Sequence, residues 1–170
     1  HQVCDPDYYN NFRMIAFDMP WHGKSLPPKD FYLMEDEYKL TTKFYAEFIV
    51  AFCHALELKK PVIMGQSMGG NICLELALRY ENEFSALIAL EACDYSPGWW
   101  IDALHHPHIH GNEVVATSTF GLMSPESPDE HRWETWWLYA NGGPGIFKGD
   151  LYFYSVDSDF REHTSKLSGR

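Results

Sequence analysis

The stretch that most constrains the fold is PVIMGQSMGG, residues 61–70, in which an apolar run ends in a serine surrounded by glycines. The run at 62–64 is continuously apolar, which is typical of a strand buried on both faces. The residues that follow, MGGNICLELALRY (68–80), have the apolar spacing of a helix. The pattern therefore predicts a buried strand that turns sharply into a helix, with Ser67 at the turn.

The two glycines flanking this serine complete a G-x-S-x-G pattern, which predicts an exposed hydroxyl. Glycine at positions 65 and 69 removes Cβ atoms that we expect to collide in so tight a turn. The turn would push the Ser67 hydroxyl out above the sheet and leave the Met68 N–H free to stabilise an oxyanion. Gly70 suits close packing of the helix on the sheet. The alternative interpretation is a tight strand–helix turn that carries no chemistry.

Two further apolar runs extend the alternation of strands and helices. RMIAFDM (13–19) ends before a proline, and ALIALEA (86–92) follows the helix, so both are predicted to be buried strands. Residues 36–58 have a helical pattern between the first run and the serine. Its apolar positions recur every four residues at Leu40, Phe44 and Phe48. The order strand, helix, strand, helix, strand predicts an α/β fold with a parallel sheet and crossover helices.

The composition changes after residue 95 to a region rich in Trp, His, Pro and Gly. We therefore expect two domains, a partial α/β core at 1–95 and a mainly helical, aromatic-rich region at 96–170. Ser127, Pro128 and Glu130 have the spacing of a helix start, with serine as the cap and glutamate as its capping-box partner.

The formal net charge of −11 argues against a nucleic-acid partner, because phosphates would be repelled. No apolar run approaches the length needed to cross a bilayer. The four cysteines, Cys4, Cys53, Cys73 and Cys93, form no CxxC pair. They are predicted to be buried free thiols, which favours a reducing compartment such as the cytoplasm.

The histidine-rich stretch HHPHIH, residues 105–110, invites a metal interpretation. Pro107 interrupts any helix that would place these ligands on one face, and no nearby acidic residue or cysteine completes an obvious set. We therefore expect a polar surface loop and neither a metal nor an organic cofactor.

Two stretches resemble the α/β-hydrolase fold superfamily. FDMPWHGKS (17–25) looks like the FD-x-P-G-HG-x-S turn of these enzymes, and KKPVIMGQSMGG (59–70) looks like their nucleophile elbow. The specific resemblance covers about 13–94. It implies that Ser67 is the nucleophile and that Met68 supplies one oxyanion N–H.

The same resemblance implies lesser roles for other residues. His22 belongs to the turn motif and is expected to be structural, while Trp21 stands where the family usually has glycine and could bring an indole near the pocket. The aromatic region at 96–170 stands where the family places its cap. Some of its tryptophans are expected to line an apolar pocket over the serine. The candidates are Trp99, Trp100, Trp133, Trp136 and Trp137.

The implied function is hydrolysis of a small, largely apolar ester, lactone or amide through an acyl-enzyme at Ser67. The fold also hosts C–C bond hydrolases, perhydrolases and non-enzymatic ligand-binding sensors, and these stay open as alternatives. An acidic α/β interaction domain with an incidental serine is a further alternative. The sequence does not indicate an oligomeric state.

A serine nucleophile needs a base and an acid, and in this family both follow it in the chain. No segment matches their usual setting, so we expect an internal fragment of a longer protein, weakly active or inactive alone. Two alternatives within the chain remain. Asp94 follows the third predicted strand, and a strand at 151–156 could present Asp157 or Asp159 as acid with His163 as base.

Overall fold

The computed structural model describes residues 2–26, 29–30, 37–105 and 111–167. They divide into two units, each packed within itself. The first unit consists of His1–Tyr32 and Asn112–Gly143, and the second of Leu33–Gly111 and Pro144–Arg170. The predicted boundary between a core at 1–95 and a helical region at 96–170 stays a prediction.

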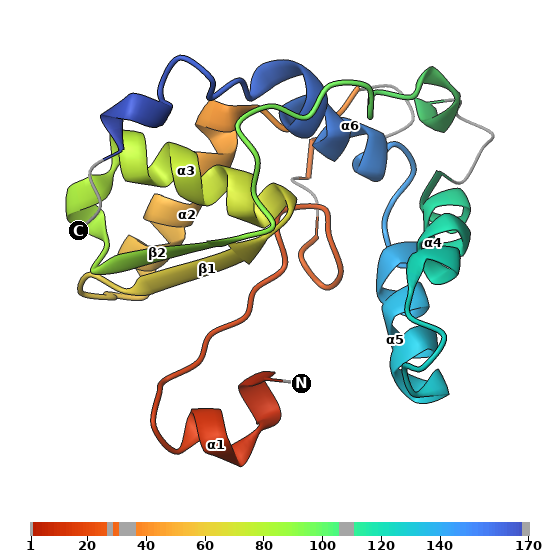
Figure 1. The fold of residues 1–170 in the computed structure, drawn as a ribbon, viewed down its shortest axis with the longest axis horizontal. Coiled ribbons are helices and arrows are strands. Elements are labelled where there is room, and N and C mark those ends of the chain that lie inside the picture. Colours follow the sequence, from red (N-terminus) through yellow and green to blue (C-terminus); the bar gives the residue numbers. More distant parts are fainter. Residues whose placement is uncertain (1, 27–28, 31–36, 106–110, 168–170) are drawn as a thin grey trace. The chain divides into compact units, whose positions relative to one another are not determined.

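The second unit is built on a strand–helix–strand crossover (Figure 1). Strand β1 (Val62–Gln66) leads into α3 (Met68–Arg79), and strand β2 (Ala86–Leu90) then pairs with β1 in parallel. The register runs from Val62 opposite Ala86 to Gln66 opposite Leu90. This confirms the predicted α/β class with a parallel sheet and a crossover helix.

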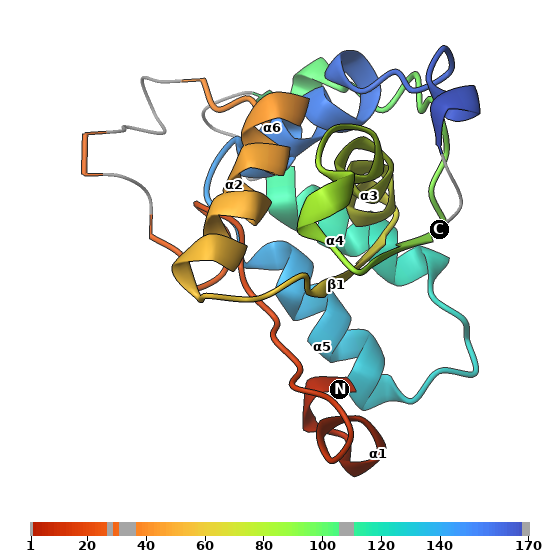
Figure 2. The same cartoon turned by 90° about the vertical axis from the view of Figure 1, so that its left-hand side faces the viewer.

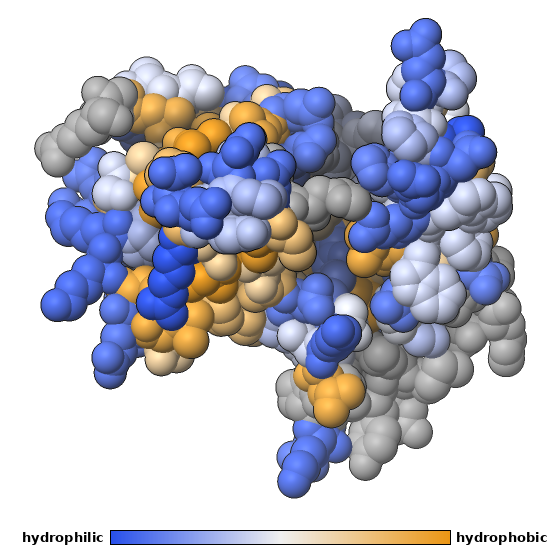
Figure 3. Space-filling view, turned by 90° about the horizontal axis from the view of Figure 1, so that it is seen from below, coloured by the Kyte–Doolittle hydropathy of each residue, from blue (hydrophilic) through white to orange (hydrophobic). Residues whose placement is uncertain are grey.

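Helices cover only one face of this sheet within the unit. Helix α2 (Thr42–Ala55) packs on α3, and both lie on the same side of β1 (Figures 1 and 2). Hydrophobic side chains gather on the other face (Figure 3). They belong to Val62, Met64, Ile88 and Leu90, which are between 41% and 54% exposed. The prediction that both strands are buried on both faces is therefore wrong, because no described helix of this unit packs on the second face.

Helix α2 begins later than predicted. The Thr41 hydroxyl oxygen accepts a hydrogen bond from the Phe44 N–H at 3.1 Å and caps the helix. Residues 37–40 precede the cap, and the Leu40 N–H donates to the Gly149 carbonyl at 3.0 Å instead of joining a helix. The predicted start at 36 lies outside the described residues.

The buried face of α2 also differs from the predicted one. It is formed by Thr42, Ala46, Ile49 and Cys53, which follow the spacing of one helical face. Phe44 is 37% exposed, and its ring lies beside that of Phe48 in a tilted arrangement, at a ring-centroid distance of 6.3 Å. The buried face of α2 thus consists of small and β-branched residues rather than phenylalanines.

Two predicted strands are not strands. Residues 13–19 form an extended, largely exposed connection with no ladder to another described segment, and an unpaired strand cannot satisfy its own backbone groups. Residues 151–156 are helical: α6 (Ile146–Tyr152) continues into a π-helix at Phe153–Asp157. The β-type composition of this stretch is overridden by its packing, since Leu151, Phe153 and Ser155 are all buried.

Helix α6 is held against residues 37–40 by buried polar groups. Lys148 is 4% exposed, with its Nζ 3.4 Å from Glu37 Oε1 and 4.4 Å from the centre of the Trp100 ring. The Tyr38 hydroxyl donates to Asp150 Oδ1 at 3.2 Å. Burial and the Asp150 charge raise the pKa of Tyr38 well above its usual value, so this hydroxyl stays protonated.

The first unit contains α1 (Pro6–Tyr9), most of α4 (Gly111–Leu122) and α5 (Asp129–Ala140). Helices α4 and α5 contact through Phe120 and Trp133, whose ring centroids are 4.9 Å apart. Short 3-10 helices lie at Gln2–Cys4, Glu81–Glu83, Asp102–His105 and Thr164–Lys166. Helices therefore form all the regular structure assigned to the described residues after β2.

Helix α5 starts one residue later than the predicted cap implies. Pro128 occupies the N-cap position with a ψ of 136°, and no side chain caps the helix. Because this ψ is not helical, the first helical residue is Asp129 and Ser127 lies too early to reach the first turn. The prediction of a Ser127 cap is wrong, although the helix itself is present.

All four cysteines are free thiols. Cys53 and Cys73 are buried, Cys93 is half-buried and Cys4 is exposed, so the prediction of buried thiols fails at Cys4. Among the described residues, no helix combines the length and apolar character that a bilayer crossing requires.

Candidate active site

Ser67 forms the junction between β1 and α3 in a backbone conformation that is rare for a side-chain-bearing residue. Its φ is 53° and its ψ is −116°. The Ser67 N–H donates to the Leu90 carbonyl at 2.9 Å, and its carbonyl accepts the Asn71 N–H at 2.9 Å. One bond ties the residue to the sheet and the other starts the helix, so both sides hold the turn in place.

The Ser67 side chain does not perform the structural task that its position offers. Serine at an N-cap usually accepts a hydrogen bond from the first turn, but Ser67 makes no such bond to α3. The residue is exposed, and no described residue hydrogen-bonds its hydroxyl. The predicted strand–serine–helix turn with an outward hydroxyl is present. Its catalytic role stays a prediction.

The glycines around the serine have different functions. A Cβ on Gly65 would lie 2.1 Å from the Gly69 carbonyl oxygen, so no other residue fits there. A Cβ on Gly70 would lie 2.5 Å from the Leu90 carbonyl oxygen, which confirms the predicted close contact between helix and sheet. A Cβ on Gly69 would meet nothing within 4 Å. The expected collision at position 69 is therefore wrong, since the crowding comes from the Gly69 backbone.

Met68 is the first residue of α3, where N–H groups have no acceptor within the helix. The partial positive charge of a helix N-terminus adds to the attraction of this N–H for an anion. Further along α3, burial raises the pKa of the Cys73 thiol to about 11, and a backbone hydrogen bond from Gly65 opposes this only in part. The thiol is protonated at neutral pH and does not compete with the serine as a nucleophile.

The loop after β2 is fixed to the first turn of α3 by a buried amide. Asn71 is 3% exposed, and its Oδ1 accepts the Cys93 N–H at 3.0 Å. The Cys93 Sγ lies 2.6 Å from the Ser96 Oγ. Asp94, a candidate acid, follows Cys93 in the chain and is exposed. Its backbone carbonyl accepts the Phe160 N–H at 2.7 Å. Its role as an acid stays a prediction.

The other candidate acids and the candidate base are engaged with other groups. Asp157 Oδ2 accepts the Thr42 N–H at 2.6 Å, at the start of α2. Asp159 binds the Arg161 guanidinium at 2.6 and 2.9 Å, which lowers the pKa of Asp159 to about 2. His163 Nδ1 lies 3.0 Å from Lys166 Nζ. Among the described residues, no acid–base pair is therefore assembled on the serine.

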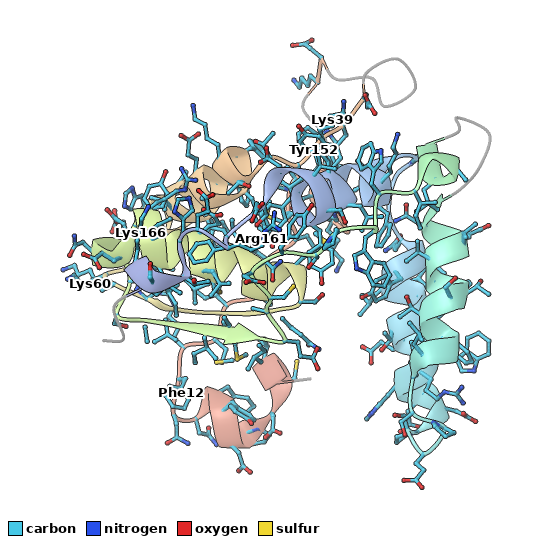
Figure 4. The ribbon with its side chains drawn as sticks, turned by 45° about the horizontal axis from the view of Figure 1, so that its top comes forward. Phe12, Lys39, Lys60, Tyr152, Arg161 and Lys166 are labelled. Atoms are coloured by element: carbon cyan, nitrogen blue, oxygen red, sulfur yellow. The ribbon has the colours of Figure 1, made fainter. Side chains whose placement is uncertain are left out.

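The Arg161 region is a charged surface rather than an apolar pocket. Asp159, Arg161, Glu162 and His163 line an open depression of about 620 Å³. Arg161 and Lys166 both come from the segment that follows the π-helix (Figure 4). This lining of charged groups differs from the apolar lining expected of a small-molecule site.

In the first unit, the turn that contains Trp21 and His22 is closed by its own polar groups. Gly23 has a φ of 51°, and the Asp18 carboxylate accepts the Lys24 N–H at 3.0 Å. His22 Nδ1 lies 2.9 Å from the Pro20 carbonyl oxygen of the same turn. The contact agrees with a structural role for His22, which stays a prediction.

The structure does not test the expectations for the histidine stretch or for a tryptophan-lined pocket. Of the histidine stretch, residues 106–110 lie outside the described residues. The described residues contain no group of three His, Cys, Asp or Glu side chains placed to hold a metal ion. Trp133, Trp136 and Trp137 belong to the first unit, and Trp99 and Trp100 to the second. An apolar pocket lined by tryptophans stays a prediction.

No sequence pattern singled out Glu91, which directly follows β2. Its Oε2 accepts a hydrogen bond from Gln66 Nε2 at 2.7 Å, and Gln66 directly precedes Ser67. The signal that could have found Glu91 is the pairing of the two strands, because parallel register brings the residues that end each strand to the same edge.

A family model for the alpha/beta hydrolase fold matches residues 4–124. A protein of Mycobacterium phage D29 named as a non-heme haloperoxidase is 30% identical over 83 residues, which are 49% of this chain and 27% of that protein. The uncharacterized hydrolase YugF of Bacillus subtilis (strain 168) is 29% identical over 104 residues, which are 59% of this chain and 36% of that protein. The chain thus spans about a third of the length of these relatives.

A solved structure of a hydrolase from Pseudomonas aeruginosa PA01 has a similar fold. The TM-score is 0.71 at 18% sequence identity, and the match covers 89% of this chain and 56% of that chain. At this identity the likeness concerns the fold alone.

Proposed function

Because the chain belongs to the alpha/beta hydrolase fold family, we propose that it carries the nucleophile of a serine hydrolase, with Ser67 attacking a substrate carbonyl. The observation that carries the proposal is the left-handed backbone of Ser67 between β1 and α3, with a hydroxyl that caps nothing. Such strain in a residue other than glycine is expected where function requires it.

In the proposed reaction, Ser67 Oγ forms a bond to the carbonyl carbon and its proton passes to a base. The carbonyl oxygen becomes an oxyanion, to which the Met68 N–H donates a hydrogen bond at the N-terminus of α3. The leaving group departs with a proton, and an acyl ester remains on the serine. Water then attacks that ester and releases the acid.

The base and acid that complete this reaction are proposed to come from sequence outside this chain. The proposal is supported by the other engagements of Asp157, Asp159 and His163, and by the greater length of the relatives. We therefore expect the 170-residue chain alone to turn over esters weakly or not at all. Ester turnover by this chain equal to that of a longer protein containing it would contradict this.

The proposed substrate is a small, largely apolar ester, lactone or amide. A second candidate is a perhydrolase, in which hydrogen peroxide replaces water and an acyl group on the same serine leaves as a peracid. The name of the phage relative favours this candidate. Formation of peracetic acid from acetate and hydrogen peroxide would distinguish it from simple hydrolysis.

Labelling with a fluorophosphonate probe tests the nucleophile. Ser67 is the only hydroxyl-bearing residue within residues 60–79, a segment that trypsin releases, so mass spectrometry of this peptide reports on one side chain. In a longer protein that contains this chain and supplies the base, we expect the peptide to gain the phosphonate at pH 8, and Ser67→Ala to reduce labelling to background.

Ser85→Ala is the matched control, because Ser85 is an exposed serine just before β2, at the opposite end of the sheet. It should leave labelling of the 60–79 peptide unchanged. A longer protein with the base present whose Ser67 peptide stays unmodified with excess probe would contradict the proposal. If such a chain still gained thermal stability with a ligand, a binding-only protein of the same fold would be favoured.

A further inference from the structure

The two strands end together, and each is followed by a residue with a positive φ. Gln66 opposite Leu90 is the last pair of the sheet, and the next residues, Ser67 and Glu91, have φ values of 53° and 51°. A positive φ is strained for a residue other than glycine. Glu91 therefore has a positive φ, as the proposed nucleophile does, at the same edge of the sheet.

The Glu91 carboxylate is held beside the serine turn. Its Oε2 accepts a hydrogen bond from Gln66 Nε2 at 2.7 Å, and Gln66 is covalently joined to Ser67. The donor is an uncharged amide, and Glu91 forms no ion pair with any described residue. The contact thus orients the carboxylate and leaves its negative charge uncompensated.

A fixed negative charge at this edge affects any ligand that approaches Ser67. It repels an anionic group and attracts a cationic one, and both effects act without a direct contact. A partial negative charge on the substrate carbonyl is also less favoured beside it, unless the substrate carries a compensating positive charge.

We propose that Glu91 is a specificity-determining residue that makes the Ser67 site prefer cationic over neutral and neutral over anionic esters. This inference rests on the proposed function, because it assigns a substrate class to the same site. The preference comes from the position of one carboxylate, which Gln66 orients across the ends of the two strands.

The test measures binding rather than turnover, so it does not need a complete catalytic apparatus. In the Ser67→Ala chain, NMR titrations follow the backbone amides of residues 66–68 with three acetate esters of similar size. These are acetylcholine, its uncharged analogue 3,3-dimethylbutyl acetate, and the anionic 2-sulfoethyl acetate. We expect affinities in that order, with a difference on the order of tenfold between the two charged esters at low salt.

The Glu91→Gln substitution keeps the size of the side chain and removes its charge, and it should reduce the difference to about twofold. Glu91→Lys should reverse the order. Glu57→Gln is the matched control, since Glu57 is also an exposed glutamate with a positive φ of 54° but follows α2, before β1 begins. It should leave the order unchanged. In the chain that retains Glu91, the difference in affinity between the two charged esters should become smaller as sodium chloride is raised to 0.5 M.

The inference is overturned if the three esters bind equally, if none binds at millimolar concentration, or if Glu91→Gln and Glu57→Gln have the same effect. Its failure is separate from failure of the proposed function. Labelling of Ser67 combined with equal ester affinities removes the charge preference alone. Loss of the affinity order in Glu91→Gln, when the fluorophosphonate does not label Ser67 in the longer protein, removes the nucleophile and retains the charge preference.

Discussion

The turn at residues 18–25 and the turn at Ser67 use left-handed backbone in opposite ways. In the first, Asp18 accepts the Lys24 N–H and its carbonyl accepts the Ser25 hydroxyl, so side chains of the turn close the turn itself. In the second, the backbone of Ser67 is bound to Leu90 and Asn71, and the side chain takes no part.

In the turn at 18–25, the polar side chains hydrogen-bond within the turn. In the turn at Ser67, the hydroxyl makes no such bond. A self-closed turn depends on its own side chains and has none to spare for a ligand. The serine turn is held from outside, by a neighbouring strand and by the helix it starts. Its hydroxyl is therefore available to a substrate. A serine at a helix start that does not cap the helix is a candidate for a function other than structure.

The largest expected effect comes from breaking the serine turn at Gly65. Gly65→Ala would place a Cβ 2.1 Å from the Gly69 carbonyl oxygen, and a backbone atom cannot move aside as a side chain can. We expect a loss of about 3 kcal/mol in the free energy of unfolding, measured by urea denaturation. Gly69→Ala is the matched control: its Cβ meets open space, and alanine should stabilise α3 by about 0.5–1 kcal/mol. Equal losses in both variants would contradict the assigned geometry.

A smaller effect is expected from opening the self-closed turn. Asp18→Ala removes the acceptor of the Lys24 N–H, and since this bond is exposed we expect a loss of about 1 kcal/mol in urea denaturation. Asp18→Asn keeps an oxygen acceptor without charge and should lose about half as much. If alanine is tolerated as well as asparagine, the turn does not depend on its own side chain.

The smallest effect on stability should come from Asp159, whose carboxylate binds Arg161, two residues further along the chain. Arg161 lowers the pKa of Asp159 to about 2 from a usual value of 3.8. The folded chain therefore holds this proton less tightly than the unfolded chain. The resulting stability is present above pH 4 and is lost as the pH falls towards 2. Arg161→Gln should destabilise the chain more at pH 6 than near pH 2, as measured by urea midpoints. An equally large difference at both pH values would show that Arg161 does not stabilise the chain through Asp159.

The features that sequence predicted best are those set by neighbours along the chain. The turn at Ser67, the start of α3 at Met68 and the parallel pairing of β1 with β2 follow from local spacing and from the need of a crossover helix. Burial was predicted less well, because it depends on what packs on a surface. The β1 residues Val62 and Met64 are apolar in sequence but exposed on the face without a helix.

Residues that act through distant partners were the hardest to predict. The stretch at 151–156 has strand-like composition, yet Lys148 and Asp150 anchor the preceding helix to residues 37–40, and the helix continues through this stretch. At the site, Ser67 and Met68 have a local signature, whereas Glu91 becomes relevant only through strand register. The parallel pairing itself was predicted, but the register that places Glu91 beside Gln66 is not visible in a local pattern.

The missing cap on α3 has a consequence for protein engineering. Helix ends without a side-chain cap are common targets for stabilising substitutions, which typically gain about 1 kcal/mol. Position 67 would be chosen by such a survey, although it already holds a residue well suited to capping. A redesign that relaxes the backbone at this position and lets the hydroxyl cap α3 would produce a more thermostable chain. The serine hydroxyl would then no longer be free to attack a substrate.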